Sequence, residues 1–257
     1  NNISGQSPSV SEFEEACANK FDRKYGISVS NGSVALDIAL QSLDLKEDDE
    51  VILPSFTIIS CLAAIVRTGA KPIFCDVDSK TWNMRLEDIE KVYTSKTRAV
   101  LIVNTYGLTA EATKISNYCK ENDLILIEDA AEAHGQVEND KKCGSFGLIS
   151  SLSFYANKHV TTGEGGMVMT NSDKYASTLR QMRNLDFTPE NRFQHDNFYW
   201  NYRLGSLQAA LGRSSINSIE KTIYTKIKKA KVYDELLSDY SDLIAVSYTH
   251  LTLPTKA

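Results

Sequence analysis

The feature that most constrains the fold is an alternation between short apolar segments and longer amphipathic segments. The short segments are rich in β-branched residues and are predicted strands: 50–53, 71–77, 98–104, 123–129, 148–154 and 166–170. Between them lie segments with helical apolar spacing: 33–43, 57–68, 85–93, 110–122 and 173–183. Strands that are apolar throughout suit a sheet covered on both faces, and alternation with helices indicates parallel βαβ units. We therefore predict an α/β domain with a mostly parallel sheet and helices on both faces.

Two further helices are expected after this region, over 202–212 and 216–240. The second is lysine-rich, and its charges are those of a solvated helix face. We expect residues 1–215 to form a large domain. Residues 216–257 would then hold a connecting helix and the start of a second, smaller domain.

Composition narrows the class of protein. The net charge of -5, without a basic run, argues against nucleic-acid partners. The five cysteines include no CxxC pair, which favours reduced thiols over disulfides or a metal site. The first residues lack the apolar core of a signal peptide, and no apolar run approaches the ~20 residues needed to span a bilayer. We expect a cytoplasmic protein with neither a metal nor a membrane partner.

Several common motifs are absent from the sequence. It contains no GxGxxG after the first predicted strand, no GxxxxGK[ST], no HExxH and no GxSxG. These absences count against a dehydrogenase, a P-loop enzyme, a zinc protease and an α/β-hydrolase.

Lys158 is the first candidate for chemistry. A lysine taken alone is most often a solvated surface charge. This one follows a mostly apolar predicted strand and precedes a turn containing Gly163, Gly165 and Gly166. Glycines allow the backbone to pass close to a ligand or a neighbouring element. A lysine that loses its proton on desolvation can attack a carbonyl carbon.

Asp129 is the second candidate, at the carboxyl end of a predicted strand, where open α/β sheets bind their ligands. The alternative is a simple N-cap for a following helix. Pyridoxal 5'-phosphate (PLP) chemistry needs a carboxylate beside the pyridine nitrogen, because a protonated ring is a better electron sink. Asp129 and Lys158 on neighbouring strand ends would supply the two groups.

A third candidate is the turn formed by Asn31, Gly32 and Ser33, which precedes a strong helical run. Backbone amides and the helix dipole at such a turn face an anion favourably, and a phosphate fits there. The same residues are also good capping residues, so the turn by itself leaves both interpretations open.

Five blocks in this order and spacing resemble one family. The blocks are SNGSVALDIAL, ILPSFT, IEDAAEAHG, SFYANKHVTTGEGG and NYRLGSLQAALG. They are similar to PLP-dependent nucleotide-sugar aminotransferases of the DegT/StrS type, over roughly residues 10 to 240. The resemblance implies the aspartate aminotransferase-like fold, PLP fold type I. Within the family, PSFTIISC and TTGEGGMV look most like perosamine synthases and related 4-aminotransferases.

The resemblance implies roles around the cofactor ring. Lys158 would form the Schiff base with PLP, and Asp129 would pair with the pyridinium nitrogen. Glu132 would lie near the ring hydroxyl.

The resemblance also implies a phosphate site and a homodimer. The amides of Gly32 and Ser33 and the hydroxyl of Ser153 would hold the phosphate. Asn201 would reach the phosphate of the neighbouring subunit's cofactor, so the active sites would be shared. Arg203 lies in the same block, but an arginine at a dimer surface is often only structural.

Other residues near these motifs have simpler interpretations. His134 and His159 are expected to be packing or hydrogen-bonding residues rather than catalysts. Cys61 and Cys143 are expected to be buried small hydrophobes. Tyr106 could contact substrate, although a core tyrosine is the preferred interpretation.

The chain departs from the family pattern in two ways. Ile58 occupies the position that often carries an aromatic ring over the cofactor. The chain also lacks the family's first segment and nearly all of the small C-terminal domain, so we expect a fragment. Its last ten or so residues, in SYTHLTLPTKA, look foreign to the family.

The expected reaction transfers an amino group from L-glutamate to a nucleotide-linked 4-keto-6-deoxy sugar, as in polysaccharide biosynthesis. One alternative is a nucleotide-sugar 3-dehydratase, but relatives of that kind carry histidine in place of Lys158. Another is a PLP-binding regulatory or vestigial protein without catalysis. The nucleotide, the sugar and the choice between C4 and C3 are left open.

Overall fold

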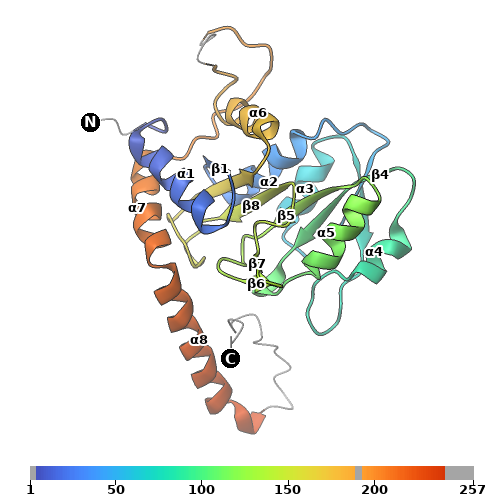
Figure 1. The fold of residues 1–257 in the computed structure, drawn as a ribbon, viewed down its shortest axis with the longest axis vertical. Coiled ribbons are helices and arrows are strands. Elements are labelled where there is room, and N and C mark those ends of the chain that lie inside the picture. The colour runs from blue at the N-terminus through green and yellow to red at the C-terminus, as the bar shows by residue number, and fades with distance from the viewer. Residues whose placement is uncertain (1–3, 189–192, 241–257) are drawn as a thin grey trace.

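The centre of the molecule is a seven-stranded sheet in a computed structural model that describes residues 4–188 and 193–240 (Figure 1). In spatial order the strands are β1 (Tyr25–Val29), β9 (Gly166–Thr170), β8 (Ile149–Ser153), β5 (Ile125–Asp129), β4 (Thr97–Val103), β2 (Glu50–Pro54) and β3 (Lys71–Cys75). Strand β9 is antiparallel to both neighbours, and the other adjacent pairs are parallel. The predicted mostly parallel sheet is confirmed.

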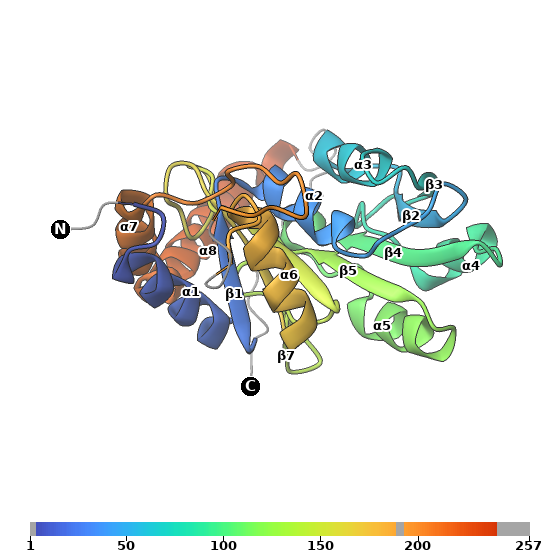
Figure 2. The same ribbon diagram turned by 90° about the horizontal axis from the view of Figure 1, so that it is seen from above.

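Helices cover both faces of the sheet (Figure 2). One face packs against α2 (Gly32–Gln41), α3 (Ile59–Val66) and α6 (Asp173–Arg183). The other packs against α1 (Pro8–Lys20), α4 (Leu86–Val92), α5 (Ala112–Glu121) and α7 (Ser206–Asn217). Successive strand residues serve opposite cores: Val51 and Leu53 belong to one, and Ile52 belongs to the other. This is why strands such as β2 and β4 are apolar at most positions.

One long helix and four short elements complete the described chain. Helix α8 (Ile219–Leu236) follows α7 after a break at Ser218 and extends away from the sheet (Figure 1). The other elements are a small hairpin and two single turns of 3₁₀-helix: β6 (Val137–Glu138), β7 (Lys141–Lys142), η1 (Thr105–Gly107) and η2 (Ser238–Tyr240).

The N-terminal elements α1 and β1 were not predicted. Helix α1 begins with Pro8 in its first turn and buries Val10, Phe13 and Cys17, a helical spacing that the sequence does contain. Strand β1 is short and includes a glycine and a serine. Its position is fixed by pairing with β9, which is distant in sequence.

The predicted start of a helix at residue 202 is wrong. The Tyr202 amide donates to the Arg183 carbonyl oxygen, and Arg203 forms a β-bridge with Val29. The helix therefore begins at Ser206, after these extended residues. The division into domains at residue 215 stays a prediction, and the expected foreign ending lies outside the described residues.

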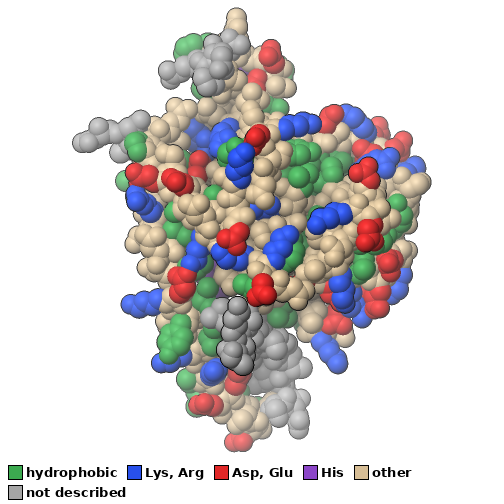
Figure 3. Space-filling view, viewed as in Figure 1, with side chains coloured by type: hydrophobic (Ala, Val, Ile, Leu, Met, Phe, Trp, Pro, Cys, Tyr) green, Lys and Arg blue, Asp and Glu red, His purple; other side chains and the backbone are tan. Residues whose placement is uncertain are grey.

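The surface shows no segregation of charge on the face drawn in Figure 3, where basic and acidic side chains are interspersed. Among residues 4–188 and 193–240, no helix is both long and apolar enough to cross a membrane. In the same residues, no group of three or more His, Cys, Asp or Glu side chains is placed to hold a metal ion.

Candidate active site

A cavity of about 800 Å³ lies where β4, β5 and β8 end and α2 begins. Six predicted site residues line it: Gly32, Ser33, Asp129, Glu132, Ser153 and Lys158. Strands β5 and β8 are direct parallel neighbours, so the chain segments after their carboxyl ends meet at one edge of the sheet. The expected meeting of Lys158 and Asp129 at neighbouring strand ends is what the structure shows.

Lys158 lies in a turn shortly after β8. Its backbone amide donates to the Tyr155 carbonyl oxygen at 3.0 Å. Its ammonium nitrogen Nζ lies 3.0 Å from Oε1 of Glu132, and the lysine side chain is largely shielded from solvent. The carboxylate of Glu132 therefore orients the amine beside the cavity.

Asp129 is buried at the end of β5. Its Oδ1 accepts hydrogen bonds from the Ala131 amide at 3.0 Å and the Ser151 hydroxyl at 3.1 Å. Its Oδ2 lies 3.6 Å from the thiol sulfur of Cys61. Burial raises the pKa of the Asp129 carboxyl group, and burial together with this carboxyl raises the pKa of the Cys61 thiol. A cationic ring nitrogen in the cavity would offset the cost of this buried carboxylate, so the residues fit PLP.

The N-terminus of α2 lies at one end of the cavity. The Asn31 side chain accepts the Val34 amide at 2.9 Å, and the amides of Gly32 and Ser33 lie in the first turn, where a helix offers no acceptor. A Cβ atom on Gly32 would lie 2.8 Å from Cβ of Ser153. Glycine at this position therefore lets α2 approach β8 closely. The capping interpretation of this turn is confirmed, and binding of an anion there stays a prediction.

Asn201 lies outside the residues that line the cavity. It is exposed and forms an isolated β-bridge with Asn184, and its Oδ1 accepts the Arg203 amide at 3.3 Å. Its expected contact with a partner subunit's cofactor stays a prediction.

The preferred interpretation of Tyr106 as a core residue is wrong. Tyr106 is 49% exposed and lines the cavity, because η1 turns it outward shortly after β4. Asn104 was also missed, although a polar residue directly after a buried strand is a usable signal. Ser60 was missed without such a signal: it enters the site through a 2.6 Å hydrogen bond to the Ser33 hydroxyl.

The simpler interpretations of other residues hold. Cys61 and Cys143 are buried. The His134 ring is buried against Phe154, and its Nδ1 accepts the Val160 amide at 3.3 Å. Ile58 lines the cavity at its exposed side.

The sheet order, the lysine after β8, the buried carboxylate at the end of β5 and the N-terminus of α2 at the same cavity match the fold of type I PLP-dependent transferases. The chain belongs to the DegT/DnrJ/EryC1/StrS aminotransferase family, whose model matches residues 1–252.

Known relatives agree with this family. The chain is 36% identical over 231 residues to the GDP-perosamine synthase of Vibrio cholerae, covering 90% of this chain and 63% of that protein. The aminotransferase structure from Psychrobacter cryohalolentis is similar with a TM-score of 0.85 and 32% identity, covering 92% of this chain and 62% of that one.

A further similar structure is the Escherichia coli GDP-4-keto-6-deoxy-D-mannose-3-dehydratase with bound hydrated PLP. Its TM-score is 0.85 at 25% identity, covering 91% of this chain and 66% of that one. The chain thus spans less than two thirds of the length of each of these three proteins.

Proposed function

We propose that the protein is a PLP-dependent aminotransferase that moves an amino group from L-glutamate to a nucleotide-linked 4-keto-6-deoxy sugar. The observation that carries this proposal is one cavity that joins the Lys158 amine, the buried Asp129 carboxylate and the first turn of α2. The bound PLP of the related dehydratase structure supports the choice of cofactor. The names of the perosamine synthase relatives support the substrate class.

The chain's own residues divide the binding of PLP between the two ends of the cavity. The amides of Gly32 and Ser33 and the hydroxyl of Ser153 would hold the phosphate. The Asp129 carboxylate would hold the proton on the ring nitrogen. PLP, when bound, supplies a carbonyl that condenses with amines and a ring that accepts electron density from the adjacent carbon.

Lys158 would serve both as the attachment point and as the base. As a free amine, Nζ would take the proton from Cα of glutamate and would then donate a proton to the cofactor. Glu132, 3.0 Å away, keeps this amine beside the cavity during the transfer. The same steps in reverse would aminate the keto group at C4 of the sugar.

Assembly and location are further parts of the proposal. We infer a homodimer in which Asn201 completes the partner's phosphate site. The exposed Phe198 and Trp200 beside Asn201 give apolar surface for such a contact.

A cytoplasmic location is supported by five free cysteines that are all buried. A role in polysaccharide biosynthesis rests on the names of relatives alone.

The rival enzyme function is 3-dehydration of a nucleotide-linked sugar, which the similarity to the dehydratase structure favours. Retained Lys158 disfavours it, because dehydratases resembling this family carry histidine there. Release of ammonia from the sugar, in place of glutamate-dependent amination, would establish the dehydratase.

The test is a multiple-turnover assay with PLP, L-glutamate and a nucleotide-linked 4-keto-6-deoxyhexose, following 2-oxoglutarate and the amino sugar. The wild type should form both products in equal amounts, and Lys158→Ala should form neither. Lys71→Ala is the matched control. Lys71 is an exposed lysine at the amino end of β3, whereas the cavity lies at the carboxyl ends of the strands. Full turnover by Lys158→Ala would contradict the proposal. Binding of PLP without any reaction would favour a non-catalytic role.

A further inference from the structure

An aromatic cluster formed by Phe56, Trp82 and Tyr106 has no part in the cofactor site proposed above. Phe56 and Tyr106 line the cavity, and Trp82 packs against both. The ring centroids are 4.7 Å apart for Phe56–Trp82, 6.2 Å for Phe56–Tyr106 and 6.1 Å for Trp82–Tyr106. The three residues are 38%, 43% and 49% exposed. Each of the three residues is therefore partly open to solvent, next to the proposed reaction site.

The sheet brings these three rings together. Phe56 follows β2, Trp82 lies in the loop after β3, and Tyr106 lies in η1 after β4. Strand β2 pairs with both β3 and β4, so the three segments leave adjacent strands at their carboxyl ends. This is the edge at which open α/β sheets bind ligands.

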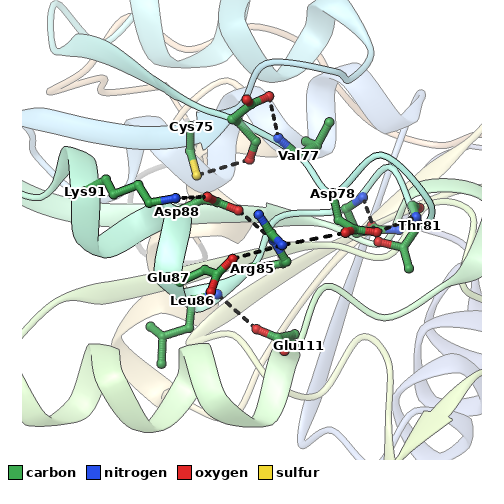
Figure 4. A network of polar contacts seen from close by, with 12 residues as sticks. Cys75, Val77, Asp78, Thr81, Arg85, Leu86, Glu87, Asp88, Lys91 and Glu111 are labelled. Carbon is green, nitrogen blue, oxygen red and sulfur yellow. Dashed lines mark hydrogen bonds and ion pairs between the residues drawn. The ribbon is translucent and has the colours of Figure 1, made fainter.

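A network of polar contacts fixes the loop that carries Trp82 (Figure 4). Oδ1 of Asp78 accepts the Lys80 amide at 3.0 Å and the Thr81 amide at 2.8 Å, and the Asp78 carbonyl accepts the Trp82 amide at 2.8 Å. Arg85 lies 3.7 Å from Asp78 Oδ2 and also forms a 2.8 Å ion pair with Asp88. The loop is thus tied to the start of α4 and holds Trp82 in place.

Two of the three aromatic residues have left-handed backbone conformations, with φ of 61° at Trp82 and 54° at Tyr106. Such conformations are strained for bulky residues and persist only where the surroundings hold them. Buried Asn83 supplies one restraint, because its Oδ1 accepts the Thr105 amide at 2.8 Å and its Nδ2 donates to the Thr105 carbonyl at 3.3 Å. Glu132 supplies another by accepting the Tyr106 amide at 2.9 Å. The structure maintains two strained turns that present exposed rings.

We propose that Phe56, Trp82 and Tyr106 form a subsite that stacks against the base of a nucleotide. The identity of that nucleotide as part of the substrate rests on the proposed function. A nucleoside base is a flat π-system, which matches a preformed aromatic surface, whereas glutamate and a hexose offer no such ring. Because every base has a π-face, the cluster gives affinity for a base without choosing among bases.

Binding can be measured apart from catalysis. The chain has two tryptophans, Trp82 and Trp200, so Trp200→Phe leaves Trp82 as its single tryptophan. In this background we would titrate GDP, guanosine and ribose 5-phosphate while recording tryptophan emission. GDP and guanosine should quench Trp82, and ribose 5-phosphate should not. If GDP quenches Trp82 in this background and the wild-type protein catalyses no transamination, the base subsite stands and the proposed function is refuted.

Ring-removing variants test the assignment further. Phe56→Ala and Tyr106→Ala should each weaken GDP binding by at least about fivefold, as loss of base stacking does. Tyr106→Phe, which keeps the ring, should bind as the wild type does. Tyr93→Ala is the matched control, since Tyr93 is an exposed aromatic outside the cavity lining.

Three results would overturn the assignment. The first is no quenching by GDP, and the second is equal quenching by ribose 5-phosphate. The third is that acrylamide does not quench Trp82 in the ligand-free protein, which would show that the cluster is already covered and closed to a base.

Discussion

Lys158 Nζ lies 3.0 Å from one carboxylate oxygen of Glu132, and the other oxygen accepts the backbone amide of Tyr106 at 2.9 Å. One side chain therefore links the amine that would carry the chemistry to the strained turn that presents an exposed ring. Both contacts involve the charged carboxylate, and hydrogen bonds to an ionised group are stronger than neutral ones. The orientation of Lys158 and the conformation at Tyr106 are coupled through Glu132.

The close approach of α2 to β8 predicts the effect of Gly32→Ala. The added methyl group would lie 2.8 Å from Ser153 Cβ and 3.1 Å from its Oγ, so the phosphate end must shift. We expect the Kd for PLP to rise by at least about tenfold, or ~1.4 kcal/mol, in a spectroscopic titration. Gly69→Ala is the control for a glycine-to-alanine change outside the cavity: φ of 87° strains an alanine there and lowers stability, but the open space around Gly69 leaves the phosphate end in place. If Gly69→Ala weakens PLP binding equally, overpacking at the cavity is not the cause.

Burial of Asp129 predicts opposite effects of Asp129→Asn on stability and on function. Its pKa is raised in the folded protein by burial, so its contribution to stability is present at low pH and is lost as pH rises through the folded pKa. At pH 7 the neutral amide should therefore raise the Tm of cofactor-free protein by about 2–4 °C, the shift that ~1 kcal/mol produces in a domain of this size.

The same variant should reduce turnover by at least about a hundredfold, because the ring nitrogen loses its counter-charge. Thermal unfolding without PLP and steady-state kinetics with PLP give the two measurements. A lower Tm together with normal turnover would contradict both the burial argument and the assigned role.

His134 predicts a dependence of stability on pH. Burial, followed by the nearby His159 and Lys158, lowers the pKa of His134 well below 6.5. A depressed pKa means that the stabilising neutral form is retained above the unfolded-state value and its contribution is lost as pH falls below about 6.5. His134→Asn should flatten the fall in unfolding free energy between pH 6.5 and 5.5 by up to ~1.4 kcal/mol. Urea titrations at pH 6.5 and 5.5 test this, and a fall in His134→Asn as large as that of the wild type would contradict the role of His134.

The shared site predicts complementation between two inactive variants. If Asn201 completes the partner's phosphate site, Lys158→Ala and Asn201→Ala subunits mixed at random should recover about one quarter of wild-type activity, since half of the dimers carry one intact site. Each variant alone should be strongly impaired. Exchange of subunits is checked by native mass spectrometry. Mixed dimers without recovered activity would show that Asn201 does not act across the interface.

Part of this structure could be predicted from sequence because the signals are local. Apolar strands and the polar residues after them predicted the sheet and the meeting of Lys158 with Asp129. Glu128 and Asp129 are adjacent in the sequence, and the sequence does not show that their side chains have different partners. Glu128 is also buried, but it accepts the Asn104 side chain at 3.0 Å and the Gly144 amide at 2.6 Å, so it braces a loop rather than facing the cavity.

Contacts between distant segments account for what was not predicted. Strand β1 depends on its pairing with β9, and extended pairing also delays the start of α7. The outward turn of Tyr106 requires a left-handed backbone held by Glu132, 26 residues away. Propensity and periodicity carry no information about such contacts.

The half-reaction with L-glutamate tests the central claim most directly. Protein loaded with PLP is mixed with L-glutamate alone, and the visible absorbance of the bound cofactor is followed together with 2-oxoglutarate. We predict loss of that absorbance with one 2-oxoglutarate formed per bound cofactor, and neither change at a comparable rate in Lys158→Ala. A bound cofactor whose absorbance does not respond to glutamate, or a Lys158→Ala variant that reacts like the wild type, would contradict the account.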